Sequence, residues 1–171
     1  LMFMYARFEN INSCLLQFQT GNMKDISLWN AFLSVQIQTK NSEIAVSFFH
    51  GLLRMGLEPD NVTVLSLVSA CVQLNSLNLA DCVTAYIIRK GFDKDLVISN
   101  ALINMLATCG NILSARKLFE GLVEKDSVSW NVMINGYGLH GDGEGALDLF
   151  LQMKLSGVKP NGITYSSILS A

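Results

Sequence analysis

Charge and proline are both scarce in this chain of 171 residues. Asp, Glu, Lys and Arg make up 15% of it, the formal net charge is −2, and there are 2 prolines. Hydrophobic residues make up 50% of the chain, which is too many for an intrinsically disordered protein. The slight excess of acidic residues leaves no basic footprint of the kind that nucleic-acid-binding proteins usually carry. Composition alone therefore indicates a folded chain and counts against a nucleic-acid partner.

The sequence also lacks the patterns that accompany metal sites and membrane spans. Its four cysteines are widely scattered, no CxxC motif occurs, and neither His50 nor His140 lies beside a cysteine. The cysteines are Cys14, Cys71, Cys82 and Cys109. This spacing is wrong for zinc, so we expect no metal and no cofactor, and we interpret the cysteines as small buried thiols that suit a reducing compartment. No apolar run approaches the roughly 18 residues that span a bilayer, so we expect no membrane partner.

What the sequence does contain is a long internal repeat. Residues 1–70 align with residues 102–171 at an offset of 101 positions without a gap. The segment "KDISLWN" falls on "KDSVSWN", so that Trp29-Asn30 matches Trp130-Asn131. Downstream, Gly56 and Pro59 match Gly157 and Pro160. Matches at one fixed offset over the whole overlap indicate a repeat rather than chance.

The long period divides into three shorter units, each of which reads as two helices. The equivalent positions Asn30, Leu65, Asn100 and Asn131 are separated by 35, 35 and 31 residues. Apolar residues at helical spacing form two stripes in residues 127–161 and two in residues 96–126. The stripes are Trp130, Met133, Ile134 and Tyr137; Ala146, Leu147, Phe150 and Met153; Ala101, Leu102 and Met105; and Ala115, Leu118 and Phe119. Glycines separate the two helices in residues 127–161 and in residues 96–126, and Gly157 and Pro160 predict the end of a second helix.

A single helix pair of this kind cannot bury its apolar stripe, whereas stacked pairs can. The sequence therefore predicts an all-α fold, an α-solenoid whose concave face is lined by the first helix of each pair. The Met and aromatic residues of the stripes are interpreted as stacking core.

A period near 35 residues narrows the choice to two types of helical repeat. The W-x2-L-G-x2-Y start of tetratricopeptide repeats is absent. One segment resembles the pentatricopeptide repeat: "VSWNVMINGYGLHGDGEGALDLFLQMKLSGVKPN". The 35/35/31 alternation resembles the P, L and S motifs of the plant PLS subfamily, and the resemblance covers essentially the whole chain. It implies a right-handed α-solenoid of stacked helix–turn–helix repeats.

The resemblance implies the following division of the chain. It consists of a partial S-type repeat (1–25), a P-type repeat (26–60), an L-type repeat (61–95), an S-type repeat (96–126), a second P-type repeat (127–161) and the start of an L-type repeat (162–171). Two places depart from the pattern. Phe8-Glu9 replaces the Cys109-Gly110 of the later S-type repeat, and "VQIQTKNSEIAVSFF" lacks the glycines of its partner. In that segment we expect Asn41 to adopt the left-handed turn, because Asn tolerates it.

Pentatricopeptide repeats bind single-stranded RNA, about one base per repeat, through two or three side chains. In the family, one reader lies in the first turn of the first helix and the other is the last residue of the same repeat. The first position holds Asn30, Leu65, Asn100, Asn131 and Ser166, and the last holds Asp25, Asp60, Asp95, Asp126 and Asn161. An amide both donates and accepts, so Asn can address the edge of a base. The aliphatic side chain of Leu65 cannot address a base edge, so we expect its repeat to be silent, that is, to select no particular base.

Helix N-capping is the alternative interpretation of these asparagines, because Asn is unfavourable inside a helix. Capping explains one Asn well, but explains less well an Asn that recurs in three repeats and always pairs with Asp or Asn at the repeat end. We therefore favour base reading, with Trp130 packing the stack and Asn131 facing the RNA.

A β-branched residue near each repeat start resembles the family's side chain that sandwiches a base. These residues are Val62, Val97, Val128 and Ile163, and Ser27 replaces them in the first P-type repeat, which should grip its base less well. In the family, Asn with Asp favours uracil, and Asn with Asn favours cytosine and then uracil. The solenoid runs parallel to the RNA, with its N-terminus at the 5′ end. Residues 26–161 are therefore expected to read U-x-U-C or U-x-U-U.

Basic residues are few along the expected path of the RNA. Arg89, Lys90, Lys94, Arg116 and Lys117 are the local cations, and we interpret them as solvated helix faces. The aspartates at the repeat ends add negative charge. We therefore expect stacking and hydrogen bonds to set sequence preference, while basic residues of flanking repeats supply much of the affinity.

The resemblance implies a specificity module of a C-to-U RNA-editing factor, or of another RNA-processing factor, in a mitochondrion or chloroplast. The deaminase signature, H-x-E with P-C-x-x-C, is absent, so this segment is not expected to be an enzyme. The chain starts with Leu1 and shows no signal-peptide pattern, which indicates an internal fragment. A targeting peptide or deaminase-like domain would then lie outside it. Expected partners are single-stranded organellar RNA and editing-complex proteins or a deaminase domain.

Two other functional interpretations remain open at this point. A protein-binding scaffold would use the solenoid groove for a peptide, and the negative charge favours it. A degenerate fragment is the third interpretation, motivated by the missing glycines near Phe8 and Gln36.

Overall fold

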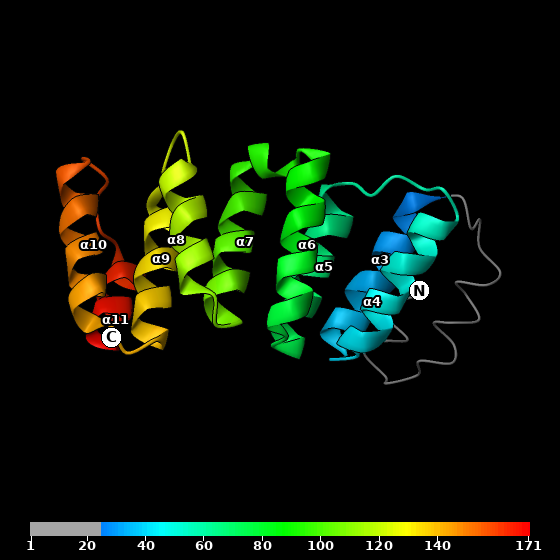
Figure 1. Cartoon of the computed structure of the whole chain (residues 1–171), viewed down its shortest axis with the longest axis horizontal. Coiled ribbons are helices and arrows are strands. Elements are labelled where there is room, and N and C mark those ends of the chain that lie inside the picture. Colours follow the sequence, from blue (N-terminus) through cyan, green and yellow to red (C-terminus); the bar gives the residue numbers. More distant parts are fainter. Residues whose placement is uncertain (1–24) are drawn as a thin grey trace. The chain divides into compact units, whose positions relative to one another are not determined.

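The structure of the protein is a computed structural model that describes residues 25–171, and in this range the regular elements are all helical (Figure 1). The α-helices are α3 (Ile26–Gln38), α4 (Ser42–Arg54), α5 (Asn61–Leu74), α6 (Leu77–Lys90), α7 (Leu96–Thr108), α8 (Ile112–Gly121), α9 (Ser127–Leu139), α10 (Gly143–Leu155) and α11 (Gly162–Leu169). A 3-10 helix, η1 (Phe92–Lys94), precedes α7. Most of the partial first repeat, with Phe8-Glu9 and Cys14, lies outside the described residues.

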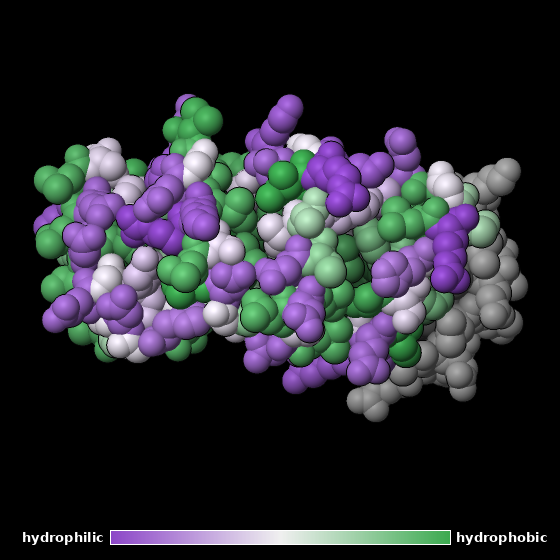
Figure 2. Space-filling model, in the orientation of Figure 1, coloured by the Kyte–Doolittle hydropathy of each residue, from purple (hydrophilic) through white to green (hydrophobic). Residues whose placement is uncertain are grey.

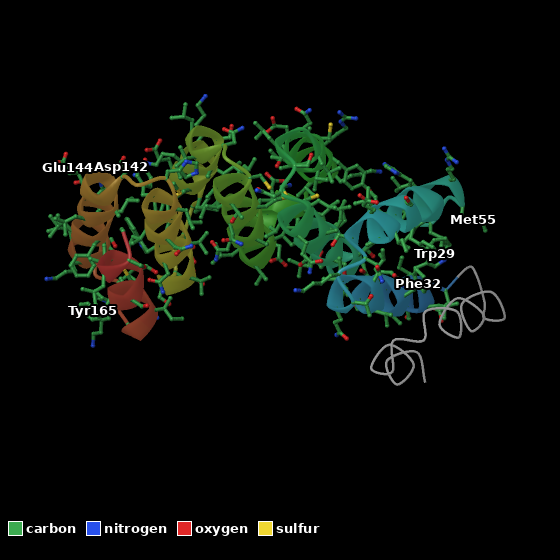
Figure 3. All side chains as sticks on the ribbon, turned by 90° about the horizontal axis from the view of Figure 1, so that it is seen from below. Trp29, Phe32, Met55, Asp142, Glu144 and Tyr165 are labelled. Atoms are coloured by element: carbon green, nitrogen blue, oxygen red, sulfur yellow. The ribbon has the colours of Figure 1, made fainter. Side chains whose placement is uncertain are left out.

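The chain divides into two compact units, residues 1–74 and 75–171. In the first unit, α3 and α4 form a helical hairpin and α5 packs against both. The core of this hairpin contains Trp29, Phe32 and Leu52, all at most 5% exposed. The rings of Phe32 and Phe48 stack at 4.0 Å between centroids. Figure 3 labels Trp29 and Phe32 on α3. The apolar stripe of α3 therefore packs against the second helix of its own pair, as the helical spacing predicts.

In the second unit, α7 packs against α8 and α9, and α9 packs against α10 and α11. Each first helix thus contacts its own second helix and the first helix of the next pair. Trp130 of α9 is buried and meets Phe119 of α8 edge to face, with 4.9 Å between ring centroids. Tyr165 of α11, labelled in Figure 3, meets Phe150 of α10 at 5.9 Å. The aromatic residues therefore join neighbouring pairs, and the packing role predicted for Trp130 is confirmed.

The apolar stripe predicted for the second helix of residues 127–161 is wrong at one position. Leu147 is 50% exposed, whereas Leu149 is fully buried. The buried side of α10 is formed by Ala146, Leu149 and Met153, at i, i+3 and i+7. Leu147 follows Ala146 by one residue and therefore points away from this side. On the face of the second unit drawn in Figure 2, hydrophobic and hydrophilic residues are interspersed over α8 and α10.

The cysteines are not all buried thiols. Cys71 and Cys109 are buried, but Cys82 is exposed on α6. The interpretation was wrong for Cys82 because the buried side of α6 consists of Ala80, Val83 and Ile87. Among the described helices, none combines the length and the apolar character that crossing a membrane requires.

The turn between the two helices of a pair uses a left-handed residue at one fixed place of the repeat. This residue is Lys40, Asn75, Gly110 or Gly141, with φ of 58°, 47°, 98° and 71°. Asn41 was expected to take this role, but its φ is −92° and its side-chain Nδ2 donates to the Thr39 hydroxyl. The expectation was wrong by one residue, because Lys40 is the residue that aligns with Gly141 at the 101-residue offset.

Lys40 is therefore the strained member of this set, and replacing it with glycine is expected to stabilise the chain. A left-handed conformation costs a residue with a Cβ roughly 1–2 kcal/mol, and Lys40 is exposed, so few contacts are lost. We expect Lys40→Gly to raise the free energy of unfolding by about 1 kcal/mol. Urea unfolding followed by circular dichroism measures the change. The reciprocal Gly141→Lys should lower the midpoint, and an unchanged midpoint in both variants would contradict the assigned strain.

Candidate functional site

The last residue of each predicted repeat caps the first helix of the next one. Asp25, Asp95, Asp126 and Asn161 are the N-caps of α3, α7, α9 and α11. Asp60 accepts a hydrogen bond from the Thr63 backbone N–H at 2.9 Å in the first turn of α5. These side-chain oxygens satisfy backbone N–H groups that a helix start leaves unpaired.

The recurring asparagines do not cap helices. Asn30, Asn100 and Asn131 lie inside α3, α7 and α9 and are only 8%, 6% and 6% exposed. Capping as an explanation for them is therefore wrong, because the repeat-end residue already occupies the cap position. A buried amide inside a helix needs hydrogen-bond partners elsewhere.

Asn30 finds these partners at the start of the next first helix. Its Nδ2 donates to both carboxylate oxygens of Asp60, at 3.0 and 2.9 Å. The Thr63 hydroxyl donates to the Asn30 Oδ1 at 2.6 Å. These three hydrogen bonds fix the orientation of the amide, since its nitrogen faces the carboxylate and its oxygen faces the hydroxyl.

Asn131 is held in the same way by an uncharged partner. Its Nδ2 donates to the Asn161 Oδ1 at 3.2 Å, and the Thr164 hydroxyl donates to the Asn131 Oδ1 at 2.6 Å. Asn161 and Thr164 also form a capping box at the start of α11. The network therefore couples α9 to α11 through the residues that begin α11.

Asn100 has only half of this network. Its Nδ2 donates to the Asp126 Oδ1 at 3.3 Å. Ser129 stands where the other networks have threonine, and its hydroxyl donates to Asp126 at 2.9 Å. Within the described part of the chain, the Asn100 Oδ1 is buried without a hydrogen-bond partner. The amide of Asn100 is therefore less firmly oriented than those of Asn30 and Asn131.

The networks also set the charge state of the aspartates. Partial burial acts to raise the pKa of Asp60, but hydrogen bonds from Thr63 and Asn30 outweigh it, so that the pKa lies below its ordinary value. The pKa of Asp126 is lowered in the same way, with burial opposed by hydrogen bonds from Ser129 and Asn100. Both carboxyl groups are therefore ionised at neutral pH.

The predicted sandwiching residues form the walls of two slots in the second unit. A slot of about 340 Å³ lies between Val97 and Val128, over Asn100 and Asp126. A slot of about 310 Å³ lies between Val128 and Ile163, over Asn131. The three wall residues are 63%, 50% and 65% exposed, although they are aliphatic. Apolar walls above an amide floor suit a flat ring with a polar edge.

The remaining predicted residues are placed as follows. Leu65 is half-buried on α5 and presents no polar group, while Asp95 caps α7. Ser166 is exposed on α11, and Asp25 caps α3. The wall residue Val62 is 51% exposed, and Ser27 at the equivalent place of α3 is exposed.

The cations do not line the two slots. Arg116 forms an ion pair with Glu120 of its own helix at 2.6 Å. Arg89, Lys90, Lys94 and Lys117 are exposed. Among the described residues, no three or more His, Cys, Asp or Glu are grouped as metal ligands. The slots therefore offer apolar surface, amides and carboxylates.

Sequence analysis missed two residues of the slots. Asn104 lines both of them, and Asn135 lines the slot over Asn131. Asn104 lies four residues after Asn100, and Asn135 four residues after Asn131, hence each lies on the same face of its helix one turn further on. The signal was present in the sequence, because an Asn pair at i and i+4 occurs in two successive repeats, 31 residues apart.

Comparison with known proteins agrees with the fold and the family that the sequence predicts. Family models match at residues 97–127 (PPR repeat) and 125–171 (PPR repeat family). A pentatricopeptide repeat-containing protein of Arabidopsis thaliana is 37% identical over 98% of this chain and 21% of its own length. A second Arabidopsis thaliana member, named as mitochondrial, is 36% identical over 99% of this chain and 27% of its length. A third, named as chloroplastic, is 31% identical over 100% of this chain and 20% of its length.

Solved structures resemble the chain over nearly its whole length. The pentatricopeptide repeat protein PPR10, in complex with an 18-nucleotide psaJ RNA element, matches with a TM-score of 0.84 at 20% identity, over 99% of this chain and 26% of that one. PPR10 from maize matches with a TM-score of 0.70 at 24% identity, over 98% of this chain and 25% of that one. The predicted fold class, an all-α solenoid of helical repeats, is confirmed.

Completing the network of Asn100 is expected to stabilise the second unit. In Ser129→Thr, the added methyl group should favour the rotamer of Thr63 and Thr164, whose hydroxyls donate to the asparagine oxygen. Because an unsatisfied buried acceptor costs about 1–3 kcal/mol, we expect a gain of roughly 1 kcal/mol in the free energy of unfolding. Chemical denaturation measures it. The matched reverse change, Thr164→Ser, should lose stability, and a loss in Ser129→Thr would sink the interpretation.

Acid is expected to weaken the aspartate networks. Because the folded pKa of Asp126 and of Asp60 lies below the ordinary value of 3.8, their stabilisation is fully present above that pH. It is lost as the pH falls through the folded pKa. Asp60→Asn together with Asp126→Asn copies the neutral Asn131–Asn161 network and should flatten this dependence. Thermal unfolding from about pH 6 to pH 2.5 measures it, and equal acid sensitivity of the two proteins would contradict the assignment.

Proposed function

We propose that this chain, which belongs to the pentatricopeptide repeat family, binds single-stranded RNA in a sequence-specific manner, about one base per repeat. The observation that carries the proposal is the recurring asparagine network below slots with exposed β-branched walls. The chain spans about a fifth to a quarter of the length of the curated relatives that it matches. The role proposed for this chain is that of a binding module, with any catalysis supplied by other parts of the protein or by a partner.

An Asn–Asp pair offers the hydrogen-bond pattern that uracil complements. One N–H of the Asn30 amide is donated to Asp60, so the second N–H remains for a base. The Asp60 carboxylate is ionised and accepts hydrogen bonds only. Uracil presents a carbonyl oxygen beside its N3–H group, and these match one donor and one acceptor. The same argument applies to Asn100 with Asp126.

An Asn–Asn pair offers a different pattern. The Oδ1 atoms of Asn131 and Asn161 accept hydrogen bonds within the protein, so the amide N–H groups are what remains for a base. Two donors match the adjacent N3 and O2 acceptors of cytosine. Uracil fits less well, because its N3 carries a proton. This chemistry supports the preference of cytosine over uracil in the 127–161 repeat.

The slots supply the non-specific part of base binding. Val97 with Val128, and Val128 with Ile163, can each sandwich one base. Val62, which is also exposed, is proposed to take the same role in its own repeat. The exposed Ser27 grips its base less well, and the repeat with Leu65 is silent. With repeats at 26–60, 61–95, 96–126 and 127–161, the chain reads U-x-U-C, or U-x-U-U, from the 5′ end.

Affinity is divided between this chain and the repeats that flank it. Asp60 and Asp126 are ionised next to the path of the RNA, and the net charge is −2. Within the slots, stacking and hydrogen bonds therefore have to overcome some electrostatic repulsion. Basic residues of flanking repeats then supply the attraction to phosphate.

The whole protein is proposed to serve RNA processing in a mitochondrion or chloroplast. Relatives named as mitochondrial or chloroplastic, and the RNA complex of PPR10, support this setting. The 35/35/31 alternation supports the PLS subfamily, with its S-type repeat at 96–126 and L-type repeats from residues 61 and 162. A role as the specificity module for C-to-U editing follows from that subfamily, with a deaminase domain or editing-complex proteins as partners.

A protein-binding scaffold is the second candidate function. The observation in its favour is that the repeat-end aspartates Asp60, in the first unit, and Asp126, beside a slot of the second unit, are ionised, which suits a basic peptide better than a phosphate chain. Base-sized slots with recurring asparagines are harder to explain in that case. Binding of a peptide does not require asparagines at the spacing of the repeats.

Selection from a random pool of single-stranded RNA tests the proposed function. We expect enrichment of U-x-U followed by a pyrimidine. Changing Asn131 to Thr and Asn161 to Asp should shift the preference at the fourth base only, because these residues read that base. Sequencing of the retained RNA measures both effects. A folded sample that enriches no sequence, yet binds a basic peptide, would favour the scaffold instead.

A further inference from the structure

Asn104 and Asn135 form a second amide position beside the readers. Asn104 is half-buried on α7 and lines both slots, and Asn135 is exposed on α9 and lines the slot over Asn131. Each lies four residues, roughly 6 Å along the helix axis, from Asn100 or Asn131, toward the C-terminal end of its helix. The slot floors therefore contain two amides in a row along the helix.

These two amides have no structural task in the described chain. Across residues 25–171, no hydrogen bond involves the side chain of Asn104 or of Asn135. Asn also disfavours the interior of a helix, because its amide competes with the backbone. Two successive repeats nevertheless carry Asn at this position.

The two L-type repeats provide an internal comparison. Ser69 and Ser170 occupy the same repeat position in the two L-type repeats. Their hydroxyls donate to the carbonyls four residues earlier, Leu65 O at 2.9 Å and Ser166 O at 2.8 Å. The serine hydroxyls thus find hydrogen-bond partners within their own helix, whereas the asparagine amides leave both a donor and an acceptor available to a ligand.

The chemistry of a nucleotide shows what these amides can meet. The polar edge of a pyrimidine is already matched by the reader and the repeat-end residue. The next polar group beyond the O2 atom of the base is the ribose 2′-hydroxyl. A hydroxyl both donates and accepts, as an amide does, so the two groups are complementary.

We propose that Asn104 and Asn135 bind the ribose 2′-hydroxyl of the nucleotides held over Asn100 and Asn131. The inference rests on the proposed RNA binding and deepens it, because it assigns the recognition of RNA rather than DNA to particular repeats. Repeats with Asn at this position require a ribose, while repeats with a Ser whose hydroxyl donates to its own helix tolerate a deoxyribose.

A coupling experiment with 2′-deoxy substitutions tests the assignment. The chain, together with its native flanking repeats, is titrated with an RNA that contains the proposed register, U-x-U-C, and with copies that carry a single 2′-deoxynucleotide at the third or the fourth position of that register. Loss of one hydrogen bond should weaken binding about 3- to 10-fold. With the unsubstituted RNA, Asn104→Ala should weaken binding by that factor. With the copy that carries a 2′-deoxynucleotide at the third position, the same substitution should weaken binding no further. Asn135→Ala should behave in the same way at the fourth position.

Ser69→Ala is the matched control, and it should leave the affinities for RNA and for the deoxy copies unchanged. Circular dichroism monitors folding, and Asn→Ala within a helix is expected to preserve it. Equal losses with the RNA and the deoxy copy would assign the amides to the base or the phosphate and overturn the proposal. An Asn104→Ala chain that binds as the unchanged chain does would also overturn it. If the unchanged chain binds no RNA at all, the proposed function itself fails.

Discussion

The rest of the site depends on one interaction, the hydrogen bond between an asparagine in one first helix and the residue that caps the next first helix. In the first unit, Asp60 binds the Thr63 backbone N–H and the Asn30 amide at once. A single side chain thus begins one helix and orients the reader of the helix before it. The spacing of the readers is therefore fixed by the stacking of the first helices, because each network joins two of them.

This arrangement explains why the readers tolerate burial. An amide that is less than a tenth exposed would be costly without partners. Asn30 and Asn131 receive them from Asp60 and Thr63, or from Asn161 and Thr164, and each still retains one N–H. The cost of ordering the amide is met during folding, so a ligand would meet a donor that is already oriented. Asn100 departs from this rule, because Ser129 turns its hydroxyl to Asp126.

Under the proposed function, charge and apolar surface play different roles. The wall residues Val97, Val128 and Ile163 are proposed to hold a flat ring without regard to its identity, and the amides and carboxylates to distinguish its edge. In that proposal, the negative charge of Asp60 and Asp126 opposes a phosphate chain, and their oxygens supply the acceptor that uracil requires. Sequence preference and overall affinity then come from different parts of the molecule.

The sequence by itself determined the period, the helix pairs and the pairing of Asn30, Asn100 and Asn131 with Asp60, Asp126 and Asn161, because apolar periodicity and repeat spacing are local properties of the chain. It did not determine which member of each pair caps a helix, that Lys40 takes the left-handed turn, or that Leu147 faces outward. Only the tertiary structure brought Thr63 and Thr164 to the reader amides and left the Asn100 oxygen unpaired. Those contacts join residues about thirty positions apart, so they exist only where one first helix packs against the next.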